Sequence, residues 1–363
     1  MRKLATLFTT LLAVLNLLCV ILLLCAAYSS YVDGEIHPAR ASMGLVFPVF
    51  AVANLCFLVL WLLLRKWYLS LLPILGFLVC FPPLRLYCPL NARTAEADLP
   101  EQRIKLLTYN VMNFNTMEKV DGQNPMLSYI LRQNPDIVCM QEFVPTINRK
   151  YLTQEDIDEL LESYPYKHIQ PPGLACYSKF PILSALPIDY GSRTNGSVMY
   201  ELLIGTDTVT LINNHLESNK LSMSDRETFE TTLQVQQKPE EIGNAFFHLL
   251  GKLNEAVQKR SYQAKVVEEV VREAQAKGRH VIVCGDFNDS PLSNAHRILT
   301  QNLNDAFSES GRGLGSSFNQ NKFYFRIDNI LVSHDLRTYN CTVDNSISSS
   351  DHYPMWCYIT KKK

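Results

Sequence analysis

Two long uncharged stretches near the N-terminus constrain the fold more than any other feature. Residues 4–28 and 43–64 are each apolar and long enough to cross a bilayer core of about 30 Å as a helix. A third run, residues 67–84, is shorter and contains three prolines. The first run exceeds the apolar core of a cleaved signal peptide, which spans about 7–15 residues, and a second run follows it. We therefore expect residues 1–90 to form a transmembrane region of about three helices.

Lysine and arginine beside these stretches predict their orientation, because short loops rich in these residues stay in the cytoplasm. Arg2 and Lys3 precede the first stretch, and a second basic pair at 65–66 separates the second stretch from the third. The loop at 29–42 carries one basic residue against two acidic ones. Three crossings place the rest of the chain outside the cytoplasm, so we expect an integral protein of a bacterial inner membrane. If the third run does not cross, the rest of the chain is cytoplasmic instead.

Beyond residue 90 the composition is that of a soluble, mildly acidic domain, with 28 Lys or Arg and 33 Asp or Glu. Residues 91–102 are polar and predict a linker, which leaves 103–363 for the domain. Duplex-binding proteins gain affinity from Lys and Arg that neutralise phosphates, so this charge balance disfavours a nuclease that grips a long duplex. None of the ten cysteines shows the C-x-x-C spacing of a zinc site.

Apolar runs of strand length recur through residues 104–359, with helical patterns between them. Several runs, such as VIVC at 281–284, are continuously apolar, which is typical of strands covered on both faces. The longest helical pattern covers about 240–277 and ends at Gly278, a common stop signal. These patterns predict a layered α/β domain. The insertion at 217–257 leaves three roles open, a lid, a substrate wall or a surface excursion.

Polar side chains stand where apolar runs stop, and together they point to one chemistry. Most of them alone are as typical of a turn, a loop or a strand end, but a carboxylate inside an apolar strand, as at residue 328, needs a partner. The set combines carboxylates, amides and two histidines, and oxygen-rich sets without cysteine suit a hard cation such as Mg²⁺ or Mn²⁺. Such a cation polarises a phosphoryl group and positions water. The residues are Asn110, Glu142, His215, Asp286, Asn288, Asp328, Asp351 and His352.

The motifs that carry these residues follow one another in a specific order. They are TYNV, QEF, GLACYSKFPI, NNHL, GDFND, RIDNILVS and SSDHYPMW. This order resembles the endonuclease/exonuclease/phosphatase superfamily, which includes deoxyribonucleases and sphingomyelinases. The resemblance covers about residues 103–361. It implies a four-layered α/β sandwich of two mixed β-sheets flanked by helices, with the site at one end.

The resemblance also implies a metal site and a residue that acts on water. Glu142 corresponds to the principal metal-ligand glutamate, and Asn110 to the amide that helps to place the metal and its waters. Asp351 corresponds to a residue near the metal. Asp286 corresponds to the residue that orients or deprotonates the attacking water. The implied cofactor is Mg²⁺, or Mn²⁺ in its place.

Three further residues correspond to groups that contact the substrate phosphate, and a fourth supports one of them. Asn288 and His352 resemble residues that hold the phosphate, and Asp328 resembles the carboxylate partner of His352. His215 resembles a second histidine, which acts as a phosphate contact or a general acid. Arg260 lies within the long helical pattern, so we expect it to be solvated rather than catalytic.

The implied activity is metal-dependent hydrolysis of a phosphate ester, with a phosphodiester favoured over a monoester. A membrane-embedded N-terminus holds the domain near lipid headgroups, which favours a headgroup phosphodiester. Anchoring alone does not choose the substrate, so a lipid headgroup and a nucleic acid both stay open. No protein partner is predicted. The alternatives are a phosphomonoesterase acting on a soluble ester and a catalytically inactive, membrane-anchored binding module. The complete set of site residues disfavours the inactive module.

Overall fold

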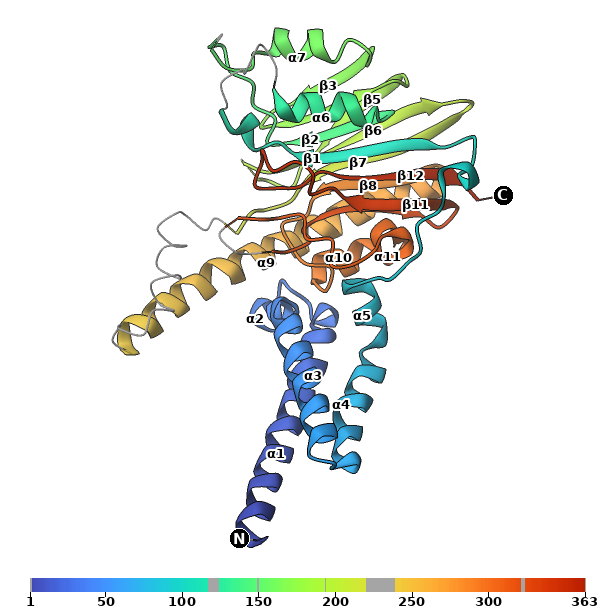
Figure 1. Cartoon of the computed structure of the whole chain (residues 1–363). Coiled ribbons are helices and arrows are strands. Elements are labelled where there is room, and N and C mark those ends of the chain that lie inside the picture. Colours follow the sequence, from blue (N-terminus) through green and yellow to red (C-terminus); the bar gives the residue numbers. More distant parts are fainter. Residues whose placement is uncertain are drawn as a thin grey trace.

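The computed structural model describes residues 2–116, 124–148, 150–192, 194–219, 239–320 and 324–362. An N-terminal helical region lies beneath an α/β domain, with the N-terminus at the far end (Figure 1). The helical region consists of α1 (Arg2–Ala27), η1 (Ser29–Tyr31), α2 (Pro38–Ala41), η2 (Ser42–Val46), α3 (Phe47–Leu63), α4 (Trp67–Val79) and α5 (Phe81–Tyr87), where η marks a 3₁₀ helix.

Two segments of the helical region are long and apolar enough to cross a membrane, judged by length and composition, namely Thr6–Ala27 and Pro38–Leu63. Helices α4 and α5 meet at a bend of 62°, so this pair is either one broken span or a re-entrant loop. Buried polar groups join the helices to one another. Trp61 Nε1 donates to Asn16 Oδ1 at 2.9 Å, and Asn16 Nδ2 donates to Asn54 Oδ1 at 3.3 Å. These bonds satisfy groups that are costly to leave unpaired in apolar surroundings.

The α/β domain contains two six-stranded sheets. The first has the order β11-β12-β1-β2-β4-β3, from β11 (Leu336–Val343), β12 (Met355–Lys361), β1 (Ile104–Asn110), β2 (Ile137–Gln141), β4 (Leu174–Ser178) and β3 (Tyr166–Gln170). The second has the order β5-β6-β7-β8-β10-β9, from β5 (Ile182–Ile188), β6 (Gly196–Ile204), β7 (Asp207–His215), β8 (His280–Asp286), β10 (Asp328–Ser333) and β9 (Leu303–Asp305).

Helices cover the outer faces of both sheets. Successive strand residues face opposite sides: Leu106 packs between the sheets and Leu107 packs toward the outer helices, and Ile282 and Val283 divide in the same way. Because both faces are buried, these strands read as continuous apolar runs. The predicted four-layered sandwich is confirmed. The helices are α6 (Pro125–Gln133) and α7 (Gln154–Leu160) on the first sheet, α9 (Pro239–Ala276) and α10 (Asn294–Leu299) on the second, and the short η3 (Glu96–Asp98), η4 (Met112–Thr116) and α11 (Ala306–Ser310).

Local signals predicted several element ends well. Helix α9 is one continuous helix, and Gly278 follows it with a left-handed φ of +72° that favours glycine. Thr153 caps α7 in a capping box with Asp156. Strand β10 begins at Asp328, within the RIDNILVS motif. Of the insertion at 217–257, residues 220–238 lie outside the described residues.

The loop between α1 and α3 packs against α9 and α10 of the α/β domain. Asn294 Oδ1 accepts from the backbone of Gly34 at 3.2 Å, and Lys265 pairs with Asp33 at 3.1 Å. A Cβ at Gly34 would lie 2.1 Å from Ser261 Oγ, so glycine permits this close approach. The N-terminal helical region is therefore joined to the domain by specific polar contacts as well as by the chain itself.

Residues 91–102, predicted as a linker, also lie along the domain. Asn91 Nδ2 donates to the backbone oxygens of Ser308 at 3.0 Å and Gly311 at 2.9 Å. Thr94 and Asn340 exchange two hydrogen bonds, of 2.8 and 2.9 Å. The polar residues of this segment therefore hold it against the surface of the domain through hydrogen bonds.

Candidate active site

Strand ends from both sheets meet at one edge of the sandwich. In the second sheet, His215 at the end of β7 and Asp328 at the start of β10 lie in register with Asp286 at the end of β8. In the first sheet, Asn110 ends β1 and Glu142 follows the end of its parallel neighbour β2. The pairing of the strands therefore decides which side chains can meet.

Asn110 links the two sheets. Its Nδ2 donates to Asp286 Oδ2 at 3.1 Å and to Glu142 Oε1 at 3.2 Å, and its Oδ1 accepts from the backbone of Met112 at 3.1 Å. Only 1% of Asn110 is exposed. The amide therefore turns its donors toward the two carboxylates and holds them near each other.

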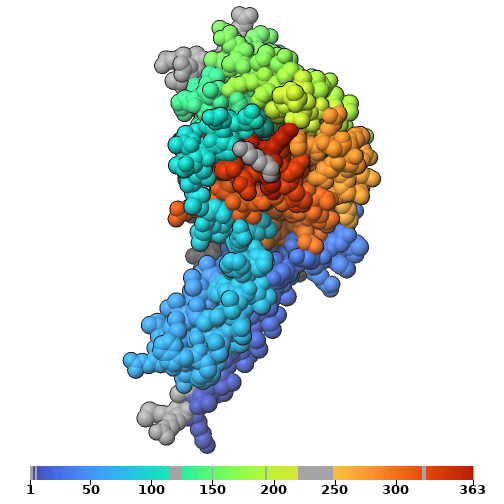
Figure 2. Space-filling model, turned by 90° about the vertical axis from the view of Figure 1, so that its right-hand side faces the viewer, coloured from blue at the N-terminus to red at the C-terminus, as the bar shows by residue number. Residues whose placement is uncertain are grey.

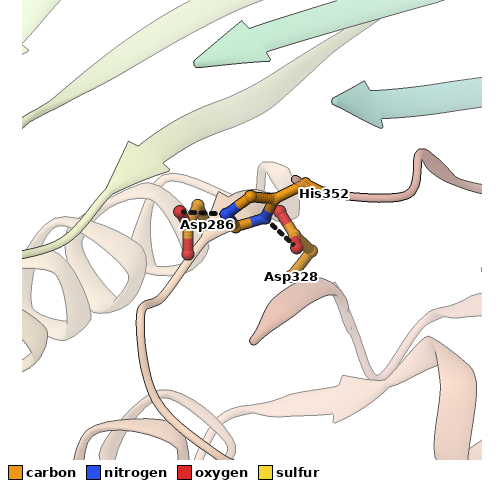
Figure 3. Close-up of side chains that lie close together, drawn as sticks. All are labelled: Asp286, Asp328 and His352. Carbon is orange, nitrogen blue, oxygen red and sulfur yellow. Dashed lines mark hydrogen bonds and ion pairs between the residues drawn. The ribbon is translucent and has the colours of Figure 1, made fainter. Parts of the chain in front are cut away.

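His352 lies between two carboxylates (Figure 3). Its Nδ1 lies 2.7 Å from Asp328 Oδ2, and its Nε2 lies 3.7 Å from Asp286 Oδ2. Burial alone would lower the pKa of His352, but the charges of Asp328 and Asp286 outweigh burial and raise it to about 10. The imidazole is therefore protonated at neutral pH, with Nδ1 donating to Asp328.

Asp286 and His215 respond to burial in opposite ways. Burial raises the pKa of Asp286 to about 6, against the opposing charge of His352. Burial lowers the pKa of His215, so this imidazole is neutral at pH 7. His215 Nε2 lies 3.8 Å from Asp286 Oδ2 and 3.7 Å from Glu142 Oε1, and it has no hydrogen-bond partner among the described residues. A buried polar atom without a partner can form a hydrogen bond with a bound ligand.

The loop after β8 holds Asp286 in place. Asn288 has a left-handed φ of +52°, and its backbone N–H donates to Asp286 Oδ1 at 2.8 Å. Its side-chain Nδ2 donates to the backbone oxygen of Leu216 at 3.0 Å. Gly285 is required beside it, because a Cβ there would lie 2.0 Å from the backbone oxygen of Asn214.

Asp351 lies beside the site rather than at its centre. Ser350 Oγ donates to the backbone oxygen of Asn110 at 2.8 Å and lies 3.4 Å from Asp351 Oδ1. The charge of Asp351 helps to raise the pKa of His352, but less than the charges of Asp328 and Asp286 do. Six of the predicted site residues thus converge, while Asn288 and Asp351 flank them.

The interpretation of Arg260 as a solvated residue was wrong. Arg260 is 1% exposed, its Nε donates to Asp289 Oδ2 at 2.9 Å, and its Nη1 donates to the backbone oxygen of Glu217 at 3.0 Å. One guanidinium therefore joins the loop after β8 to the loop after β7. A signal was present in the sequence: Arg260 follows Val257 by three residues and precedes Ala264 by four, which places it on the buried face of α9.

The donors around Glu142 fit a hard divalent cation. Glu142 and Asp286 converge on one neutral amide, and no Lys or Arg of the described chain pairs with either carboxylate. Oxygen donors with excess negative charge suit Mg²⁺ or Mn²⁺. Asp286, Asp328 and His352 also offer atoms within 4.8 Å of one another, but a protonated imidazole does not bind metal. We therefore place the candidate metal site at Glu142 rather than at His352.

Comparison with known proteins identifies the same fold. Residues 107–352 match the Endonuclease/Exonuclease/phosphatase family, and residues 9–87 match a domain of unknown function. No curated protein matches the sequence. Truncated TDP2 of Caenorhabditis elegans is 19% identical with a TM-score of 0.50, covering 72% of this chain and 99% of that chain.

Two other solved structures give similar values. TDP2 of D. rerio, complexed with single-strand DNA product, is 16% identical with a TM-score of 0.51, covering 72% of this chain and 100% of that chain. The catalytic domain of human Nocturnin, with bound sulfate anion, is 16% identical with a TM-score of 0.51, covering 73% and 95%. These likenesses show the fold, and the family match includes every predicted site residue. The chain therefore belongs to the endonuclease/exonuclease/phosphatase family of metal-dependent hydrolases.

Proposed function

We propose that the protein is a membrane-anchored, Mg²⁺-dependent phosphodiesterase that acts outside the cytoplasm. One observation carries the catalytic part of this proposal. The buried carboxylate of Asp286 lies between a protonated imidazole, His352, and a neutral one, His215. A carboxylate in such a place can act on water while the two imidazoles contact an anionic phosphate.

Asp286 is proposed to orient the attacking water and to take its proton. A general base works best when its pKa lies near the working pH, because it is then both ionised and basic. Burial raises the pKa of Asp286 to about 6, which meets this condition at neutral pH. The bond from the Asn288 backbone to Oδ1 leaves Oδ2 as the oxygen that faces Asn110 and both imidazoles.

The two histidines are proposed to hold the phosphate. Protonated His352 supplies a buried positive charge, and Asp328 fixes its ring by accepting from Nδ1 at 2.7 Å. His215 contributes Nε2, the buried atom that lacks a partner among the described residues. Charge placed in advance in a site of low dielectric stabilises a transition state more strongly than the same charge in water.

Glu142 is proposed to hold the cation, with Asn110 orienting its carboxylate and Asp351 close by. When bound, Mg²⁺ supplies positive charge that polarises a phosphoryl oxygen. The side chain of Glu142 is 36% exposed, the most open of the carboxylates that contact His215. That exposure leaves room for the water molecules that Mg²⁺ retains.

The contacts of the N-terminal region support a domain outside the cytoplasm. The loop after α1 touches α9 and α10, so the domain stands on the side of the membrane that the chain reaches after one crossing. The N-terminus lies at the opposite end of the helical region (Figure 1). Arg2 and Lys3 assign that end to the cytoplasm by the positive-inside rule. This reasoning does not depend on whether α4 and α5 form a complete span.

A phosphodiester of a lipid headgroup is the proposed substrate class. One protein of similar fold, TDP2 of D. rerio, is complexed with single-strand DNA product, so a nucleic acid is the competing substrate class. Here, however, the domain is net acidic, with 28 basic and 33 acidic residues after position 90. Its attachment to the membrane favours a substrate that is already concentrated there.

The proposal is tested with the full chain in neutral detergent. Hydrolysis of bis-p-nitrophenyl phosphate is measured with Mg²⁺ and with EDTA, and then short-chain phosphodiester lipids and single-stranded DNA are compared. We expect turnover that requires Mg²⁺ and favours the lipids. Turnover of the DNA alone would contradict the lipid substrate. Turnover that EDTA leaves unchanged would contradict the proposed dependence on Mg²⁺.

A further inference from the structure

Two adjoining pockets lie beside the end of α5, between the segment that follows this helix and strand β11 of the α/β domain. Their volumes are about 570 and 430 Å³, and both are lined by Ser310 and Asn340. They open beside the segment that follows α5, and Figure 2 looks onto this side of the molecule. We call them together the basic groove, which is defined by Arg85, Arg93, Arg312, Arg337 and Lys362.

The basic groove concentrates positive charge in a domain that is otherwise acidic. All five of its Lys and Arg side chains are exposed, and Glu309 is the one carboxylate among the lining residues. Within the described ranges, no ion pair joins any of the five cations to a carboxylate. The five cations outnumber this one carboxylate, so their net positive charge favours an anionic ligand.

The groove also stands at the expected level of the membrane surface. Arg85 lies on α5, and the end of this helix is held on the domain because Arg326 Nη2 donates to the backbone oxygen of Leu86 at 2.6 Å. The aromatic rings of Tyr324 and Tyr353 line the other end. Tyrosine is enriched where apolar membrane meets water. Tyr353 directly follows His352, so the groove extends from the helices toward the active site.

We propose that the basic groove binds the headgroups of anionic phospholipids in the membrane that holds the N-terminal helices. Arginine suits this ligand because its planar guanidinium can form paired hydrogen bonds with phosphate. Bound lipid would seat the domain on the membrane surface and keep the active site facing headgroups. The inference rests on the membrane anchoring in the proposed function, but not on its catalytic chemistry.

The test measures lipid binding without turnover. The full chain in dodecyl maltoside with EDTA is titrated by calorimetry with dihexanoyl phosphatidylglycerol, and separately with dihexanoyl phosphatidylcholine. We expect saturable binding of the anionic lipid and much weaker binding of the zwitterionic one. Replacing Arg93 or Arg312 by Gln should weaken binding about fivefold each, the factor expected for one charge near an anionic membrane. Arg132→Gln, an exposed arginine on α6, is the matched control and should bind as the wild type does.

Competition separates the lipid from other anions. Inorganic phosphate and a single-stranded oligonucleotide are added at the same concentration as the anionic lipid. If inorganic phosphate displaces the bound lipid, the groove is a site for free anions. If the oligonucleotide displaces it, the groove is a nucleic-acid surface. Either result contradicts the lipid assignment. Equal affinity for both lipids, or groove variants that bind like Arg132→Gln, would overturn the proposal. Hydrolysis of bis-p-nitrophenyl phosphate by the same protein preparations, with Mg²⁺ in place of EDTA, shows independently whether the catalytic proposal stands.

Discussion

Two buried clusters in the α/β domain contain similar side chains but differ in how closely positive groups approach the carboxylate. In the active site, Asp286 lies 3.7 Å from His352 and 3.8 Å from His215 without a hydrogen bond to either ring. In the second cluster, Asp305 bonds His296 at 3.1 Å, lies 3.7 Å from Arg326, and caps α11 through two backbone N–H groups. Among the described residues, Asp286 therefore has no close cationic or imidazole hydrogen-bond donor, whereas Asp305 has both a bonded imidazole and a nearby guanidinium.

The pKa values record this difference. Burial raises the pKa of Asp286 to about 6, and the nearby imidazoles do not overcome it. Burial also acts to raise the pKa of Asp305, but Arg326 and His296 outweigh it and lower the value to about 2. Burial of an acidic residue is therefore a poor sign of function by itself. The informative sign is a buried carboxylate whose charge the protein does not fully balance.

The largest expected effect comes from removing the charge at Asp286. Asp286→Asn should lower kcat by about 10³-fold or more, because a general base contributes about 10²- to 10⁴-fold and the phosphate contacts lose their alignment. The midpoint of thermal unfolding should stay the same or rise, since a buried and poorly compensated charge disappears. Hydrolysis of bis-p-nitrophenyl phosphate and thermal unfolding of the full chain measure the two effects. Asp98→Asn, on the exposed η3 turn, is the control.

The partner of His352 should matter somewhat less. Asp328→Asn removes the largest of the three carboxylate charges that raise the pKa of His352 to about 10, and we expect a loss of about 10²-fold in kcat, within the range for one electrostatic contact. His352 must be protonated to hold phosphate, so activity falls as pH rises through its pKa. In the variant this alkaline limb should move to lower pH. A pH–rate profile whose alkaline limb stays in place would contradict the role of Asp328.

Arg260 links the two loops that flank the active site, and its effect should be intermediate. Arg260→Lys keeps the charge but cannot reach Asp289 and the Glu217 backbone together. We expect kcat to fall about 10- to 100-fold through misplacement of the catalytic groups, with little change in KM. Arg272→Lys, on the solvent side of α9, is the matched control. A variant that loses stability but keeps wild-type kcat would show that Arg260 only supports the fold.

The contrast between local and tertiary signals explains what could be predicted from the sequence. Strands carry their own signal, so the layered α/β domain and strand-end residues such as Asn110 and Asp286 followed from apolar runs. The four-layered sandwich followed from the family resemblance of the ordered motifs. The burial of Arg260 depends on which loops its helix covers, and the seating of Gly34 on α9 depends on contacts more than 200 residues apart in the chain. Such contacts leave little trace in a local pattern. The basic groove could not be predicted from a local pattern either, because its arginines are scattered from residue 85 to residue 337.

The smallest expected effect concerns Asp305 and appears as stability rather than rate. Because its folded pKa of about 2 lies below the ordinary value of 3.8, ionised Asp305 stabilises the fold above about pH 4. This contribution is lost as pH falls from about 4 toward 2, and the shift corresponds to about 2 kcal/mol. Asp305→Asn keeps an oxygen for the α11 cap, so it should lower thermal stability at pH 7 while kcat per folded molecule stays near wild type.

The pH dependence of this loss distinguishes it from an ordinary packing defect. The difference in unfolding midpoint between wild type and Asp305→Asn should shrink as pH falls below 4, because protonation removes the same charge from the wild type. A difference that is constant from pH 7 to pH 3 would show that Asp305 acts through shape rather than charge. A large loss of kcat in Asp305→Asn would break the comparison itself, since the well-paired carboxylate would then share the catalytic role assigned to the poorly paired one.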